Sequence, residues 1–148
     1  MINLFFDSSA LIAGIVSETG AARALLLLSE GKKITITVSE QVITEVERNI
    51  ARKIPKALPD TRELLLHANL TILRDPEETL LKQNKDWIKH PADLPILLAA
   101  ARAEVDFLVT LNRRHFIDDP AVSVRSGIRI GTPGDALIWV REHLNSIQ

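Results

Sequence analysis

Short apolar or β-branched runs alternate with helix-forming segments from one end of this chain to the other, and this alternation limits the possible folds most. The runs predict strands at Ile2–Phe6, Lys33–Val38, Leu70–Leu73, Asp106–Thr110 and Gly127–Ile130. The first is too short for a helix and has no polar face, which is typical of a strand buried on both sides. Strands that alternate with helices indicate an α/β fold, a three-layer α/β/α sandwich with a parallel sheet of about five strands.

Capping residues and apolar spacing give the expected helices. Ser39 precedes a helix with an apolar stripe that runs from Val42 to Ile54, and Pro55 and Pro59 mark its end. The other expected helices are Ala10–Val16 capped by Asp7 or a following Ser, Ala21–Ser29, Thr61–Asn69, one starting at Asp75–Glu78, Pro91–Ala103, and Thr132 to about Asn145. Residues 112–119 read as a polar loop with at most one helical turn.

Composition narrows the function classes. The 148 residues are expected to form one domain, 1–148, and the absence of cysteine excludes disulfides, thiolate metal sites and cysteine nucleophiles. A net charge of −1 disfavours a general polyelectrolyte binder, and 4% aromatic residues disfavour a base-stacking platform. No apolar run reaches membrane-spanning length and the first residues do not resemble a secretory signal, so we expect a cytoplasmic protein with no membrane contact.

Polar residues gather after the expected strands, where parallel sheets bind ligands. Asp7 and Ser8 follow the first strand, and Glu45 lies on the helix after the second. Asp93 opens the helix that leads to the fourth strand, which ends at Thr110 and Asn112. Three carboxylates in one pocket repel one another, and a hard divalent cation such as Mg²⁺ or Mn²⁺ relieves that repulsion. Such a centre is suited to phosphodiester hydrolysis by an activated water.

Each of these residues also has a purely structural interpretation. Asp7 can serve as a helix cap, and Asp93 favours a helix start through the helix dipole. Glu45 lies more than a right angle away from the apolar stripe, and Glu47 lies closer to it, so helix geometry does not choose between them. Asn112 suits a turn. The combination of residues, rather than any one of them, favours a site.

The ordered set of motifs resembles the PIN-domain family, and within it the VapC-type toxin ribonucleases. The matching stretches cover nearly the whole chain, and they are Leu4–Ile12, Val38–Val46, Ala92–Ala101, Asp106–Phe116 and Ile130–Pro133. The resemblance implies a metal-dependent endoribonuclease that hydrolyses RNA phosphodiester bonds, the toxin component of a type II toxin–antitoxin system. It also implies Mg²⁺ or Mn²⁺ as cofactor, RNA as substrate, a protein antitoxin as partner, and a homodimer.

Carried over by position, the resemblance implies Asp7, Glu45 and Asp93 as metal ligands, and it selects Glu45 over Glu47. These three and Asn112 form the implied catalytic set, although the family has an acid where this chain has Asn112. That departure puts a second metal in doubt, unless Asp118 or Asp119 compensates. The implied substrate-binding residues are Ser8, with Ser9 as an alternative hydroxyl, together with Thr110, Arg113 and Arg114.

Several alternatives remain open. The chain can be a catalytically weak PIN-like domain that binds RNA or protein, and Asn112 is the main support for that hypothesis. A receiver-like phosphorylation domain lacks support because Asp7 stands alone after the first strand and no lysine follows residues 127–130. The absence of a glycine-rich turn after the first strand excludes a dinucleotide site. His115, and the cations Arg48, Arg52, Lys53 and Lys56, have only weak functional readings.

Overall fold

Five parallel strands form the centre of the protein. The computed structural model describes residues 1–144. The sheet has the order β3-β2-β1-β4-β5, and every neighbouring pair is parallel. The strands are β1 Asn3–Phe6, β2 Thr35–Ser39, β3 Thr71–Leu73, β4 Phe107–Val109 and β5 Ile130–Gly131. This confirms the predicted α/β class with a parallel sheet of five strands flanked by helices.

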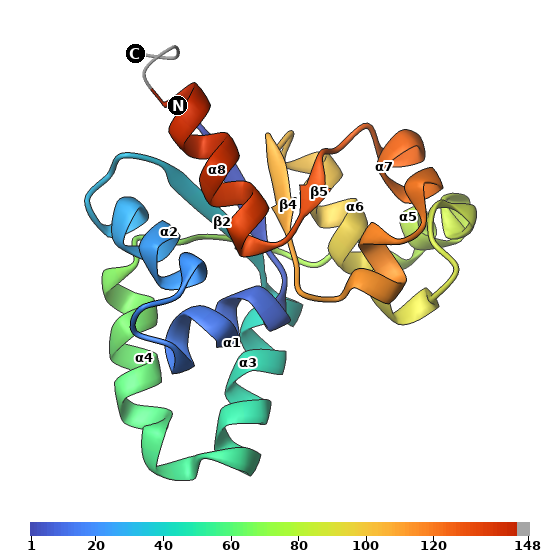
Figure 1. The fold of residues 1–148 in the computed structure, drawn as a ribbon. Coiled ribbons are helices and arrows are strands. Elements are labelled where there is room, and N and C mark those ends of the chain that lie inside the picture. Colours follow the sequence, from blue (N-terminus) through green and yellow to red (C-terminus); the bar gives the residue numbers. More distant parts are fainter. Residues whose placement is uncertain (145–148) are drawn as a thin grey trace.

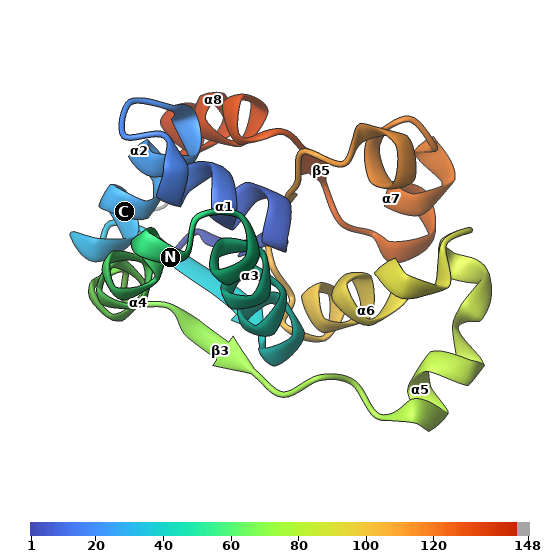
Figure 2. The ribbon, with the colours of Figure 1, turned by 90° about the horizontal axis from the view of Figure 1, so that it is seen from below.

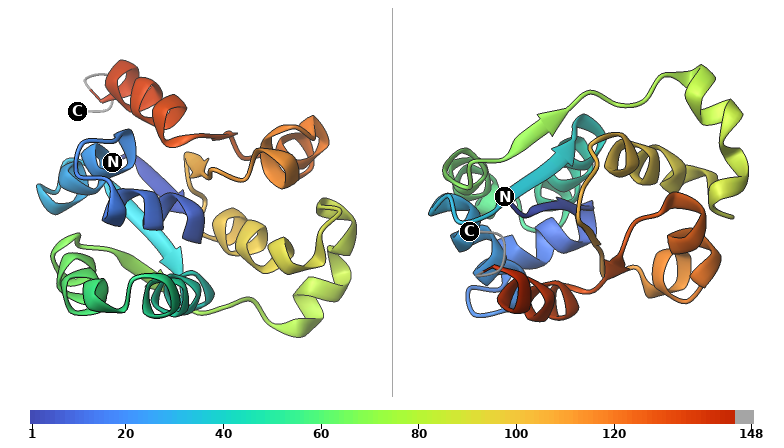
Figure 3. Two further views of the ribbon diagram at one scale, coloured as in Figure 1. Left: turned by 60° about the horizontal axis from the view of Figure 1, so that its bottom comes forward. Right: turned by 90° about the horizontal axis from the view of Figure 1, so that it is seen from above.

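Eight α-helices of the described chain surround the sheet. They are α1 Ser8–Val16, α2 Ala21–Glu30, α3 Glu40–Lys53, α4 Leu58–His67, α5 Glu78–Gln83, α6 Leu94–Arg102, α7 Pro120–Ser126 and α8 Pro133–His143. Short turns of 3-10 helix occupy Pro55–Ala57, Lys85–Trp87 and Pro91–Asp93, and a π-helical turn, η4, occupies Arg113–Ile117. Figures 1 and 2 show α2 and α4 at one end of the molecule and α5 and α7 at the other, with the sheet between them, and Figure 3 shows the same division in two further views.

Local chemistry explains where the main helices begin. Asp7, Ser39 and Thr132 each accept a hydrogen bond from a backbone N–H of the first helical turn, at the start of α1, α3 and α8. Because each cap follows a strand directly, the chain turns at the carboxyl edge of the sheet. The final helix was predicted to about Asn145, and that residue lies outside the described part of the chain.

One hydrophobic cluster joins the sheet to its helices. Phe5, Phe6 and Leu108 are fully buried in the strands, and Leu97 of α6 and Leu11 of α1 are fully buried above them. Among residues 1–144, no single helix is long and apolar enough to cross a membrane; α1 and α2 meet that requirement only as a pair bent by 91°.

Strand β5 occupies Ile130–Gly131 rather than the predicted residues 127–130, because Gly127 ends helix α7. Two helices also differ from the sequence prediction. Helix α4 begins at Leu58 rather than Thr61, because Pro59 lies in its first turn, where the missing N–H of proline costs no hydrogen bond. Helix α7 was not predicted, although Asp119 caps it, Pro120 begins it and Gly127 ends it in the left-handed conformation. Only Val122 of α7 is buried, so its apolar periodicity is too weak to identify.

The order of the strands fixes where a ligand can bind. From β1 the chain moves outward through β2 to β3, and it later returns beside β1 with β4 and moves the other way to β5. The order in which strands are added to the sheet therefore reverses between β1 and β4. Ligands of open α/β sheets bind outside the carboxyl ends of the strands at such a point. Asp7 follows β1 there, and Thr110 follows β4.

Gly127 and Gly134 provide a matched test of the backbone. The φ angle of Gly127 is 71°, whereas that of Gly134 is not positive. A Cβ atom added at Gly134 would lie 3.8 Å from its nearest neighbour, Thr132 Oγ1, so alanine fits there. We expect Gly127→Ala to lower the free energy of unfolding by about 1–2 kcal/mol, since alanine is strained in the left-handed region. Gly134→Ala should leave it unchanged or raise it by up to about 1 kcal/mol. Urea unfolding measures both, and an equal loss in the two variants would contradict the assigned end of α7.

Candidate functional site

Asp7 is the most constrained polar side chain at the switch point. It is only 4% exposed. Its Oδ1 accepts hydrogen bonds from Ser9 Oγ at 2.6 Å and from the backbone N–H of Ala10 at 2.9 Å, and its Oδ2 accepts one from Thr110 Oγ1. The backbone N–H of Asp7 donates to the carbonyl oxygen of Val109 at 3.1 Å. Asp7 thus joins the end of β1 to the end of β4.

Hydroxyl groups extend this junction. Ser9 Oγ accepts a hydrogen bond from the N–H of Leu111 at 2.9 Å, and Thr110 Oγ1 accepts one from the N–H of Asn112 at 2.9 Å. Of Ser8 and Ser9, the structure places the hydroxyl of Ser9 beside Asp7. Among residues 1–144, no hydrogen bond involves the side chain of Ser8. Thr110 is fully buried, so its hydroxyl acts on Asp7 rather than on a molecule in solution.

Asp93 lies at the entrance of α6, as the sequence predicts. It does not use its side chain to cap that helix. Instead its Oδ2 accepts a hydrogen bond from His115 Nδ1 at 2.6 Å, and the ring of His90 stacks on the ring of His115 with centroids 3.4 Å apart. No local pattern in the sequence indicates this histidine pair, because residues 90 and 115 come together only when η4 folds against the turn before α6.

Glu45 and Glu47, which helix geometry could not rank, have different environments on α3. Glu47 is partly exposed, and its Oε2 accepts a hydrogen bond from Arg62 Nε of α4 at 2.9 Å. Glu45 has a buried Oε1 that lacks any hydrogen-bond partner. A buried carboxylate oxygen without a partner is unfavourable unless something absent from the structure binds it. Glu45 is therefore the member of the pair that could bind a ligand.

The three acids influence one another electrostatically. Burial raises the pKa of Asp7 above its ordinary value, against the opposing effect of its hydrogen bonds, and the charge of Asp93 raises it further. Burial also raises the pKa of Glu45, against the opposing effect of a hydrogen bond with the side chain of Gln41, and the negative charges of Asp7 and Asp93 add to that rise. The structure thus brings Asp7, Glu45 and Asp93 near enough for mutual repulsion, which a cation would relieve.

The donor set suits a hard cation, although the side chains do not already surround one point. Within residues 1–144, no group of three or more His, Asp or Glu is arranged to hold a metal ion. Both oxygens of Asp7 and Oδ2 of Asp93 accept hydrogen bonds from protein groups, and each of these oxygens keeps a second lone pair for a cation. The unpartnered Oε1 of Glu45 and the clustering of three carboxylates nevertheless match the oxygen chemistry that Mg²⁺ and Mn²⁺ prefer.

The remaining predicted residues lie around this cluster. Asn112 Oδ1 accepts a hydrogen bond from the N–H of His115 at 3.1 Å and so caps η4. Arg113 and Arg114 are exposed on η4 directly after it. Asp119 Oδ1 accepts the N–H of Ala121 at the start of α7, and Asp119 Oδ2 lies 4.0 Å from Lys89 Nζ. The carboxylate of Asp119 therefore caps a helix and is not part of the acid cluster. Asp118 is exposed and joins no hydrogen bond through its side chain.

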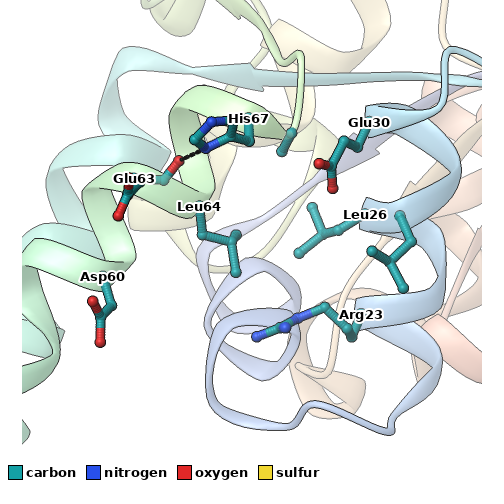
Figure 4. Close-up of a pocket in the computed structure, with 9 residues that line it drawn as sticks. Arg23, Leu26, Glu30, Asp60, Glu63, Leu64 and His67 are labelled. Carbon is teal, nitrogen blue, oxygen red and sulfur yellow. Dashed lines mark hydrogen bonds between the residues drawn. The ribbon is translucent and has the colours of Figure 1, made fainter.

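A separate hollow of about 390 Å³ lies between α2 and α4, and none of the three clustered acids lines it (Figure 4). Leu26, Leu27 and Leu64 are among its apolar lining residues, whereas Glu30, Asp60 and Glu63 supply acidic ones. The guanidinium of Arg23 also lies there but donates to the carbonyl oxygens of Gly14 and Ile15. The hollow therefore combines apolar and acidic surface.

Replacing Asp7 tests its electrostatic state. Because its pKa is raised in the folded protein, stability falls as pH rises from the ordinary value of 3.8 through the folded-state pKa. Asp7→Asn removes this penalty and keeps an oxygen acceptor for Ser9 and Ala10. Thermal melts in a chelator should show a higher Tm for the variant at pH 8, and the difference should shrink as pH falls. A variant that melts lower than the parent at pH 8, with the same gap at acid pH, would contradict this electrostatic account.

Proteins of known structure share this fold. The PIN domain family model matches residues 3–114. PAE2754 from Pyrobaculum aerophilum aligns with a TM-score of 0.61 and 14% identity over 95% of this chain and 96% of that chain. VapBC2 from Rickettsia felis, solved bound to a DNA fragment from its promoter, aligns with a TM-score of 0.60 and 19% identity over 88% and 98%. No curated protein sequence matches the chain. The family match covers more than half of the chain, and the protein belongs to the PIN-domain family.

Proposed function

We propose that this protein is a metal-dependent endoribonuclease that hydrolyses RNA phosphodiester bonds. The observation that carries the proposal is the buried, unpartnered Oε1 of Glu45 in a cluster with Asp7 and Asp93. PIN domains are typically nucleases and generally use divalent metals, which agrees with this donor set. The chain has no cysteine nucleophile, and the acid cluster suits hydrolysis without a covalent intermediate.

Asp7, Glu45 and Asp93 would hold Mg²⁺ or Mn²⁺. When bound, the ion would supply an activated water and neutralise charge on the phosphate. Ser9 and Thr110 hold Asp7 in place through their hydroxyls. Asn112 belongs to the proposed catalytic set through the Nδ2 group of its side chain, because its Oδ1 already accepts the bond that caps η4.

Arg113 and Arg114 are the proposed contacts to RNA phosphates. Both side chains are exposed and follow Asn112 on η4, so they lie beside the acid cluster. Guanidinium groups pair with phosphate oxygens through two donors, which favours arginine at this place. Lys53 and Lys56 offer a poorer surface, because Lys53 ends α3 and Lys56 lies in the turn after it, both at the opposite end from Ser39, where α3 meets the site edge. Ser8 at the start of α1 remains in the proposed substrate-binding set.

The biological role that we propose is the toxin component of a type II toxin–antitoxin system. VapBC2, a structural neighbour, was solved bound to a fragment of its own promoter. The hollow between α2 and α4 would accept a segment of the antitoxin, with apolar side chains against Leu27, which is 57% exposed, and basic ones against Glu30 and Glu63. Exposed Leu66 of α4 and Ile72 of the edge strand β3 offer an apolar surface for the proposed homodimer.

A second candidate is a PIN domain that binds RNA or protein without cleaving it. Asn112 in place of an acid favours this candidate, as does the finding that no three ligands already surround one point in residues 1–144. Titration with Mn²⁺ separates the two candidates. Saturable binding that Asp7→Asn abolishes supports the nuclease, and absence of saturable binding supports the binding domain.

Conservative replacements test the catalytic set. We expect Asp7→Asn, Glu45→Gln and Asp93→Asn each to lower Mn²⁺-dependent cleavage of single-stranded RNA by more than the roughly 10–100-fold that loss of an outer hydrogen-bond partner causes. Glu47→Gln is the matched control, because Glu47 lies on the same helix but binds Arg62, and it should cleave at the parental rate. Thermal melts establish that each variant is folded. Parental activity in a folded Asp7→Asn protein would show that the assignment is wrong.

Salt dependence tests the two arginines. We expect the combined Arg113→Ala and Arg114→Ala replacement to weaken RNA binding in a chelator and to reduce the slope of log affinity against log salt by about 0.7 per lost phosphate contact. Arg52→Ala and Lys53→Ala on α3 should leave the slope unchanged. Fluorescence anisotropy with a labelled single strand measures both. An unchanged slope in the first variant, or an equal loss in the α3 variant, would place the RNA elsewhere.

A further inference from the structure

The Asp93 carboxylate depends on one side chain for its orientation. Although Asp93 precedes α6, it makes no capping bond to that helix. In the part of the chain that the structure describes, the only hydrogen-bonding partner of the Asp93 carboxylate is His115, whose Nδ1 lies 2.6 Å from Oδ2. An ionised carboxylate only accepts hydrogen bonds, so Nδ1 is the donor. The other oxygen, Oδ1, accepts no bond from any residue between 1 and 144.

The fold holds His115 in place from two directions. Asn112 caps η4 through the N–H of His115 at 3.1 Å, and the neighbouring Phe116 is buried at 2% exposure. On the other side, the ring of His90 stacks on that of His115, with 15° between their planes. The carbonyl oxygen of His90 accepts the N–H of Asp93 at 3.0 Å, so His90 and Asp93 belong to one tight turn. The turn therefore contacts both the face and the edge of the His115 ring.

We propose that His115 is a positioning residue that fixes the Asp93 carboxylate for metal binding, an inference that rests on the proposed function. With Oδ2 bonded to His115, Oδ1 remains available to a cation shared with Asp7 and Glu45. Metal-binding carboxylates commonly accept such an outer hydrogen bond, which fixes their orientation. Asn112 then has a defined role, since its side chain places His115 rather than supplying a fourth charge.

A purely structural ion pair is the competing explanation. Ion pairs that solvent reaches contribute little to stability, because water screens the two charges. The His115 and Asp93 side chains are 29% and 18% exposed, so solvent reaches both partners. A structural pair would change the melting temperature slightly and leave metal affinity unaltered. A positioning residue would change metal affinity, and the change would depend on whether a donor remains at the place of Nδ1.

Direct Mn²⁺ binding, measured by electron paramagnetic resonance of the free ion in the absence of RNA, separates these explanations. His115→Phe keeps a flat ring against His90 but removes the donor, and we expect the Kd for Mn²⁺ to rise about 10–100-fold. His115→Asn puts an amide N–H near the place of Nδ1, and its Kd should stay within about threefold of the parent if that donor is sufficient. His67→Phe is the control, because His67 Nδ1 contacts only the carbonyl oxygen of Glu63 on α4.

The outcomes are distinguishable. A parent that binds no Mn²⁺ overturns the proposed function itself. A parent that binds Mn²⁺ while His115→Phe binds equally well overturns only the role of His115, as does an equal loss in the Phe and Asn variants. If His115→Phe does not fold, imidazole NMR of the unaltered protein provides the test. A hydrogen-bonded proton on His115 Nδ1 that disappears in Asp93→Ala, which lacks a side-chain acceptor, supports the inference, and its absence from the parent overturns it.

Discussion

The hydrogen bonds around the buried Asp7 carboxylate are the interaction on which the rest of the site depends. They connect the ends of β1 and β4, the two central strands, through Ser9, Thr110 and the start of α1. A carboxylate is expensive to bury, and three donors offset part of that cost. The same bonds place η4, because Thr110 and Asn112 follow β4 in sequence and Asn112 bonds back to Thr110. The position of His115, and through it that of Asp93, is therefore linked to Asp7.

Clustering acids in this way opposes stability and favours binding. The pKa values of Asp7 and Glu45 are raised by burial and by neighbouring negative charge, so ionising them in the folded protein is unfavourable. Such repulsion would only destabilise a purely structural core. In a cation site it strengthens binding, because the bound cation relieves it. A hydrogen bond from His115 Nδ1 orients the carboxylate of Asp93, and Oε1 of Glu45 has no hydrogen-bond partner. Repulsion, an open acceptor and an oriented carboxylate together account for the proposed nuclease centre.

Sequence predicted the architecture well because its signals are local. The apolar run of β1, the cap at Ser39 and the acids that follow strands all lie within a few residues of what they determine. Short elements with little buried surface, such as α7, were missed for want of periodicity. The contact between His115 and Asp93 spans 22 positions and needs both the π-helical turn and the turn before α6, so no local pattern encodes it. Helix periodicity likewise could not rank Glu45 and Glu47, because their environments depend on where α4 and Arg62 lie, and only the family resemblance selected Glu45 from the sequence.

The central claim is that Asp7, Glu45 and Asp93 share one divalent cation. Anomalous diffraction from crystals of the protein grown with Mn²⁺ tests it most directly. The account predicts a single strong manganese peak in coordination contact, directly or through one water, with carboxylate oxygens of all three residues, and no such peak in Asp7→Asn crystals. A well-ordered crystal at saturating Mn²⁺ with the ion elsewhere, or with no ion beside these carboxylates, would contradict it.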